Sequence, residues 1–167
     1  MKRLFLPAAV VAAMCLPAIA SATHAGAAAS VPRCSTSGLV VWMNTAGDGA
    51  AGSIYYKLEF TNLSGKTCSL AGYPGVSAVD LSGAQFGTAG ARDPSKVRTV
   101  KLANGATATA VLRVVEAGNF PSSTCHIRSA AGVRVYPPNQ TASKVVPFPF
   151  SACSAKGPAI LRVRAVT

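Results

Sequence analysis

The plainest pattern of hydrophobic and polar positions is the alternation in SIYYKLEFTN, residues 53–62. Every second side chain is apolar or aromatic, so one face carries Ile54, Tyr56, Leu58 and Phe60, and the other carries Tyr55, Lys57, Glu59 and Thr61. A period of two residues is typical of a β-strand that buries one face. We therefore expect a strand here, with the first set of side chains in the core.

Seven other segments rich in β-branched and apolar residues are predicted strands: 38–43, 76–81, 97–102, 106–115, 132–136, 144–150 and 159–166. Turn-forming stretches separate them, including a Gly-rich loop predicted at 44–53, and Asn104-Gly105 between two of them is a strong hairpin signal. No segment has an apolar stripe at helical spacing that is long enough to predict a helix. The pattern predicts an all-β protein, an antiparallel β-sandwich, with Trp42 in its core.

The first residues differ in kind from this pattern. Lys2 and Arg3 precede a long apolar run that ends in small residues, which is the layout of a secretory signal peptide. We expect residues 1–25 to be this peptide, with cleavage after Ala20, Ala22 or Ala25. Residues 26–32 would be a small-residue linker and 33–167 a single domain. No later stretch approaches the roughly 18 consecutive apolar residues of a membrane span, so we expect a secreted or envelope-associated protein without a transmembrane segment.

Charge adds a preference for anionic partners. The chain has a formal net charge of +11 at pH 7, from 16 basic and 5 acidic residues. Removal of residues 1–25, which include Lys2 and Arg3, leaves 14 basic and 5 acidic residues and a net charge of +9. Only 13% of the residues are charged, against about 25% in typical domains. The protein is therefore basic, but uncharged polar side chains must form much of its surface.

Cysteine usage fits export. Outside the leader there are four cysteines, an even number that predicts two disulfides in an oxidising compartment: Cys34, Cys68, Cys125 and Cys153. Three connectivities are open, and we favour the sequential one, which pairs the first two and the last two and closes two loops of about 30 residues. A zinc site is disfavoured because there is no C-x-x-C pair and His126 is the only imidazole nearby. We expect no metal and no cofactor.

The segment CSLAGYPGVSAVD, residues 68–80, predicts a sharp corner between strands. Pro74 fixes φ near −65°, while Gly72 and Gly75 tolerate backbone angles that other residues avoid. We expect Tyr73 to be a packing ring whose hydroxyl is hydrogen-bonded nearby. The alternative is that Tyr73 stacks on a ligand.

Several of these motifs recur together in one family. FTNLSGKTCSLAGYPGV, then Asn104-Gly105-Ala106, Cys125, VRVYPP, Cys153 and LRVRAV resemble the actinobacterial secreted family catalogued as domain of unknown function 4232. The resemblance runs from about Cys34 to Val166, although the family usually has Pro-Gly where this chain has Asn104-Gly105. It implies an immunoglobulin-like sandwich with two disulfides, exported or envelope-attached. It implies no established activity and supplies no functional residues.

Groups for catalysis are scarce. The five acidic residues are scattered along the chain, His126 is the only histidine beyond the leader region, and there is no G-x-S-x-G motif. We therefore expect a protein that is not an enzyme, with a secreted hydrolase as the less favoured reading. The N-x-S/T triplets at Asn62 and Asn139 are interpreted as turn chemistry.

Two kinds of binding module remain. The first recognises an envelope protein or a glycan through its loops. The second binds anionic envelope polymers through charge, because four arginines alternate with apolar residues and should point away from the core: Arg113, Arg134, Arg162 and Arg164. If their strands are neighbours they form a positive stripe; otherwise they are dispersed charges that favour solubility. Export and the lack of interleaved aromatic and basic residues disfavour nucleic acid as a partner.

Overall fold

A computed structural model of the protein describes residues 30–167, so the expected signal peptide and residues 26–29 of the linker lie outside the described residues. The described chain forms ten strands: β1 (Leu39–Ala50), β2 (Ser53–Asn62), β3 (Cys68–Ala71), β4 (Gly75–Val79), β5 (Ala91–Arg92), β6 (Thr99–Leu102), β7 (Thr107–Val115), β8 (Ile127–Tyr136), β9 (Lys144–Cys153) and β10 (Leu161–Val163). Its helical segments are short: η1 (Thr36–Gly38), η2 (Ala117–Asn119) and α1 (Ser122–Cys125). None of these is long enough to cross a membrane.

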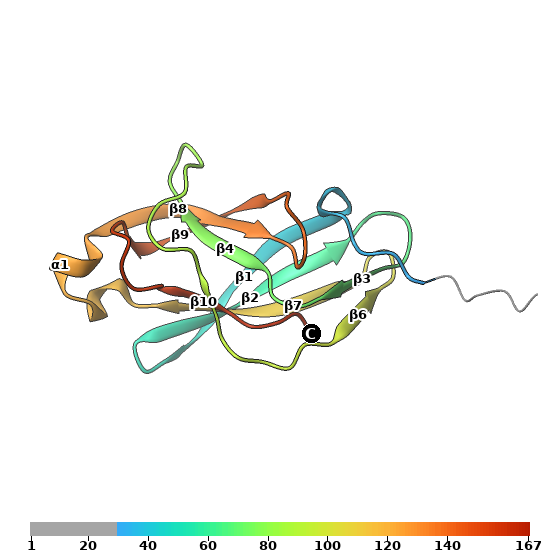
Figure 1. Ribbon diagram of the computed structural model, residues 1–167, viewed down its shortest axis with the longest axis horizontal. Helices are drawn as coiled ribbons and strands as arrows, with labels where there is room; N and C mark the ends of the chain where they lie inside the picture. Colours follow the sequence, from blue (N-terminus) through green and yellow to red (C-terminus); the bar gives the residue numbers. More distant parts are fainter. Residues whose placement is uncertain (1–29) are drawn as a thin grey trace, which may run out of the picture.

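The strands form two facing layers (Figure 1). One layer is a five-stranded sheet in the order β1-β2-β7-β10-β5, and the other contains β4-β8-β9, with the pair β3-β6 at one end. Neighbouring strands are antiparallel except β10 and β5, which pair in parallel. The predicted all-β, antiparallel fold is therefore confirmed, and the immunoglobulin-like designation stays a prediction.

The core lies between the layers, as the alternation in β2 predicts. Leu58 and Phe60 are fully buried, and the rings of Tyr56 on β2 and Phe148 on β9 meet edge to face with centroids 4.7 Å apart. Small and branched side chains from β7 and β8 fill the space beside them, including Leu112 and Val133, both with no exposed surface. Apolar burial of this kind is the dominant favourable term in folding.

The predicted Gly-rich loop at 44–53 is wrong. β1 continues to Ala50 and pairs with β2, after a register shift between Asn44 and Asp48. The turn is only two residues, Ala51 and Gly52, both with positive φ, which suits the twist of a tight hairpin. Pairing with β2 thus overrides the low strand propensity of the glycines.

The predicted hairpin at Asn104-Gly105 is also wrong in its pairing. The turn itself exists, because the Ala106 amide donates to the Ala103 carbonyl at 3.0 Å and Gly105 has a φ of 84°. Its flanking strands separate, however: β6 pairs with β3, and β7 pairs with β2 and β10. A turn signal reports local geometry and does not choose the partner strand.

Trp42 is not in the core, contrary to expectation. It lies opposite Glu59 on the outer face of the five-stranded sheet and remains 42% exposed. Its indole Nε1 donates to Thr61 Oγ1 at 3.1 Å. Glu59 lies on the same face but is buried, and its carboxylate accepts a hydrogen bond from Thr109 Oγ1 at 2.6 Å.

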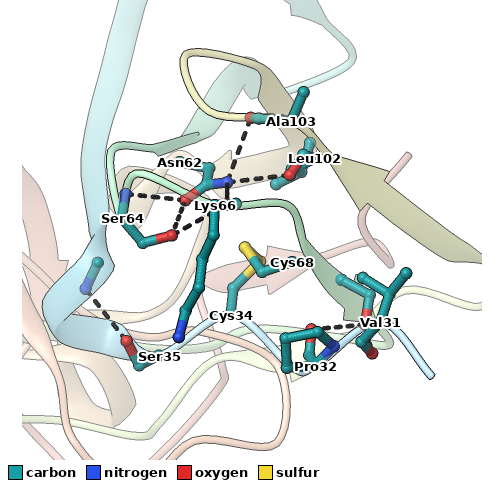
Figure 2. The surroundings of a disulfide bond; sticks show 12 residues. Val31, Pro32, Cys34, Ser35, Asn62, Ser64, Lys66, Cys68, Leu102 and Ala103 are labelled. Atoms are coloured by element: carbon teal, nitrogen blue, oxygen red, sulfur yellow. Dashed lines mark hydrogen bonds between the residues drawn. A yellow bond between two sulfur atoms is a disulfide. The ribbon is translucent and has the colours of Figure 1, made fainter. Parts of the chain in front are cut away.

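Asn62 at the end of β2 is a fully buried side chain that joins two turns (Figure 2). Its Nδ2 donates to the carbonyls of Lys66, Leu102 and Ala103 at 2.8, 2.9 and 3.2 Å. Its Oδ1 accepts from the amide and hydroxyl of Ser64 at 3.0 and 2.7 Å. The triplet at Asn62 is therefore turn chemistry, as interpreted, and it also ties the β2–β3 turn to the end of β6.

Both disulfides follow the sequential connectivity. Cys34 bonds to Cys68 beside the Asn62 turn (Figure 2). Cys125, the last residue of α1, bonds to Cys153 at the other end of the fold, where Figure 1 shows α1. All four cysteines are buried. The bridges close chain separations of 34 and 28 residues, so the chain-entropy argument gives them similar contributions.

We expect removal of either bridge to lower the free energy of unfolding by about 2–5 kcal/mol, because an open loop restores entropy to the unfolded chain. The measurement is denaturant unfolding of Cys34→Ser with Cys68→Ser, and separately of Cys125→Ser with Cys153→Ser. Peptide mapping of the unreduced protein should link the same pairs. A free thiol among these four cysteines, or a crossed pair, would contradict the assignment.

Candidate functional site

The glycine-rich corner connects two sheets. The chain leaves β3 at Ala71, turns through Gly72, Tyr73 and Pro74, and enters β4 at Gly75 in the facing layer. Gly72 has a φ of 105°, which a residue with a side chain rarely adopts. The expected corner of Gly72, Tyr73, Pro74 and Gly75 is therefore present. Its backbone conformation requires a glycine at position 72.

Tyr73 holds a second segment of the chain. Its hydroxyl donates to the Ser95 carbonyl at 2.8 Å and accepts from the Ser95 amide at 2.9 Å, with the Ser95 hydroxyl at 3.3 Å. The hydrogen bonds from the Ser95 hydroxyl and main chain, helped by the nearby charge of Arg92, lower the pKa of Tyr73 below its ordinary value. The hydrogen-bonded hydroxyl agrees with the sequence expectation.

Ser95 is also bonded to the last residues of the chain. Its Oγ accepts a hydrogen bond from the Ala165 amide at 2.8 Å. The neighbouring amides of Arg164 and Val166 donate to the carbonyls of Val111 on β7 and Gly72 in the corner, each at 3.0 Å. The corner, the loop around Ser95 and the segment 164–167 are therefore held together by direct hydrogen bonds.

A basic groove of about 660 Å³ lies between this loop, β6 and the last residues. In Figure 1 the C-terminus lies between β7 and β6. Four cationic side chains contribute to the groove, and all of them are exposed: Lys96, Arg98, Lys101 and Arg164. The remaining lining is small, apolar or hydroxylated: Ser95, Thr99, Val100, Val111, Ala165 and Thr167. No Asp or Glu side chain is among these residues.

Local structure explains how the cations meet. In β6, Leu102 is buried, so the alternating Lys101 is directed outward. Arg98 precedes the first residue of β6, so it does not follow the alternation of the strand. Arg164 follows β10 and is brought to the groove by the hydrogen bond of its amide to Val111. The strand β6, the loop before it and the segment after β10 thus each supply part of one positive surface.

The groove cations are not neutralised by carboxylates within residues 30–167. The two ion pairs found there join Arg128 to Asp80, at 3.0 Å, and Arg162 to Asp93. Hydrogen bonds from the Ser82 hydroxyl, from main-chain amides and from Arg128 lower the pKa of the Asp80 carboxyl. These groups lie outside the groove, and the Asp80 carboxylate is bound to them. The groove therefore keeps its positive potential for an external anion.

The four arginines for which the sequence left a stripe and a dispersed arrangement open are divided between the two layers and do not form a single stripe. Arg113 and Arg162 lie directly opposite each other on β7 and β10, but Arg134 is on β8 in the other layer. Arg134 donates to the Gly83 carbonyl at 2.7 Å, Arg113 to Ser53 Oγ at 2.9 Å, and Arg162 to Asp93. Of the four, only Arg164 lines the groove.

Sequence reasoning missed Lys96, Arg98 and Lys101 because it placed the whole of 97–102 in one strand. In a regular strand, positions three apart lie on opposite faces, so Arg98 and Lys101 would have been separated. The later start of β6 at Thr99 removes this conflict. Ser95 carried no signal in the sequence, since its role depends on Tyr73 and Ala165, which are distant along the chain.

His126 lies apart from the groove. It follows α1, has a φ of 46°, and is exposed. Its carbonyl accepts hydrogen bonds from the amide and hydroxyl of Ser154 at 3.0 and 2.8 Å. Within residues 30–167, no group of three or more His, Cys, Asp or Glu residues is placed to hold a metal ion.

Removal of the Tyr73 hydroxyl should loosen the groove. We expect Tyr73→Phe to lower the free energy of unfolding by about 1 kcal/mol, because the polar groups of Ser95 lose their partner, and to speed hydrogen exchange of the Ser95 amide. Denaturant unfolding and amide exchange measure the two effects. Tyr55→Phe, which removes a hydroxyl from a half-buried tyrosine on the outer face of β2, is the matched control. Equal behaviour of the two variants would contradict the role of Tyr73.

Comparison with known proteins identifies the family of this chain. No curated protein matches the chain. The family described as Domain of unknown function (DUF4232) matches residues 34–167, which includes both disulfides, the corner and the basic groove. Because the match covers well over half of the sequence, the chain belongs to this family of domains of unknown function.

Proposed function

We propose that the protein is an exported, non-enzymatic module that binds anionic polymers of the cell envelope through the basic groove. The observation that carries the proposal is the gathering of four exposed cations, Lys96, Arg98, Lys101 and Arg164, along a groove without a carboxylate side chain. Repeated anionic groups on a polymer can contact several such cations at once, which multiplies weak single contacts.

Export is supported by several independent features. The amino-terminal sequence has the layout of a secretory leader, and two buried disulfides suit an oxidising compartment. The resemblance stated from the sequence adds an actinobacterial, envelope-associated setting. In such a setting the protein meets abundant anionic polymers and little nucleic acid.

Charge-driven binding is favoured over the other two readings. A contiguous basic surface favours binding of a polyanion over recognition of an envelope protein through loops, and the groove supplies such a surface. A hydrolase would need a nucleophile and a general acid or base close to each other in one site. His126 is exposed beside a disulfide cysteine, and the carboxylates of Asp80 and Asp93 are engaged in ion pairs.

The proposal predicts that the position of the charges matters as well as their number. The groove variant combines Lys96→Gln, Arg98→Gln, Lys101→Gln and Arg164→Gln. A control of equal net charge combines Lys57→Gln, Lys66→Gln, Lys144→Gln and Lys156→Gln. We expect the groove variant to bind polyphosphate at least about tenfold more weakly than the control at low salt, since each cation near an anionic surface contributes about 1 kcal/mol.

Titration across a sodium chloride series measures this difference. Binding by wild type and control should weaken steeply with salt because exposed charges are screened, and the groove variant should show a shallower dependence. Equal affinities and equal salt dependence of the groove variant and the control would contradict the proposal.

A further inference from the structure

Ser95 lines the basic groove, and its hydrogen-bond partner Tyr73 lines a second cavity, here called the corner cavity. Its volume is about 580 Å³, within the range of about 300–1,000 Å³ that is usual for small-molecule sites. It is lined by the corner, by β5, by the loop before β6 and by the residues at and after the end of β8, among them Tyr73, Arg92, Tyr136, Asn139 and Gln140.

The lining combines aromatic rings with planar polar groups. Tyr73 and Tyr136 are both half-buried and contribute phenol rings. Arg92, Asn139 and Gln140 add a guanidinium group and two amides. A sugar ring has an apolar C–H face that packs on an aromatic ring, and hydroxyl groups around its rim that bond to amides and guanidinium donors. The chemistry of this cavity therefore suits a sugar ring.

The walls of the cavity are fixed before a ligand arrives. Tyr73 is held by Ser95, and the Arg92 guanidinium lies 5.3 Å from the centre of the Tyr73 ring. Asn139, with a φ of 59°, donates from Nδ2 to the Ala71 carbonyl at 3.0 Å. This bond directs the amide and leaves its oxygen, Oδ1, as an acceptor. Prior ordering of these groups reduces the entropy that binding would otherwise cost.

A third, smaller cavity has lining residues in common with both the corner cavity and the basic groove. This cavity of about 190 Å³ shares Ala71 and Asn139 with the corner cavity and Thr99 with the basic groove, and adds the cation Arg33. One polymer lying across β6 and β3 would therefore meet cations along one part of its length and aromatic and amide groups along the next.

We propose that the polymer bound by this protein is an anionic glycan, and that the corner cavity is a subsite for one of its sugar rings. This inference rests on the proposed function, because the groove supplies the contacts to the charged groups. The corner cavity adds discrimination: it favours a polymer built of sugars over a polyanion that has none. Tyr136 and Gln140 are the side chains assigned to the sugar ring, with Tyr73 as the fixed wall.

The test compares two polyanions, polygalacturonate, which is made of acidic sugars, and polyphosphate, which contains no sugar. We expect Tyr136→Ala to weaken binding of polygalacturonate by about tenfold while binding of polyphosphate changes by less than about twofold. Gln140→Ala should act in the same direction with less risk to folding, because its side chain lies in a loop. Tyr55→Ala, which removes a half-buried ring elsewhere, should leave both polymers bound as in wild type.

The outcomes separate this inference from the proposed function. If wild type binds polyphosphate but not polygalacturonate, or if the corner variants weaken both polymers equally or neither, the sugar subsite is wrong and the basic groove is unaffected. If the groove variant binds both polymers as well as its charge-matched control, the proposed function is wrong. Thermal unfolding of every variant shows whether a loss of binding reflects loss of the fold.

Discussion

The hydrogen bonds between the Tyr73 hydroxyl and Ser95 are the constraint on which the proposed site depends. They fix the loop that carries Lys96 and Arg98, and the Oγ of the same serine holds the Ala165 amide beside Arg164. Ser95 lines the basic groove, and Tyr73 lines the corner cavity. Without it, the basic groove would lose the fixed spacing of its cations, and the corner cavity would lose one of its walls.

The rest of the fold supports this contact from outside. The Cys34–Cys68 disulfide fixes the start of β3, and the buried Asn62 amide ties the end of β6 to the neighbouring turn. β3 and β6 therefore form a rigid pair between the groove and the corner. In this arrangement the binding surfaces lie on short strands, loops and the terminal segment, whereas the longer strands supply the core.

The sequence predicted the class of fold and the disulfides well, because these depend on periodicity and on cysteine number. The alternation in β2 placed Leu58 and Phe60 correctly in the core. Strand pairing was harder: the turn at Asn104-Gly105 is real, but β6 and β7 belong to different sheets. Whether the four arginines share one face depended on the same strand pairing: Arg134 lies in the other layer, and the cations of the basic groove are brought together by tertiary contacts.

The most direct measurement of the central claim is a titration of ¹⁵N-labelled protein with polygalacturonate, followed by NMR. The account predicts that the largest amide shifts fall in residues 95–101 and 164–167, with a second set at Tyr73, Tyr136 and Gln140. Largest shifts on the outer face of β8 and β9, or small shifts spread evenly over all basic residues, would contradict it.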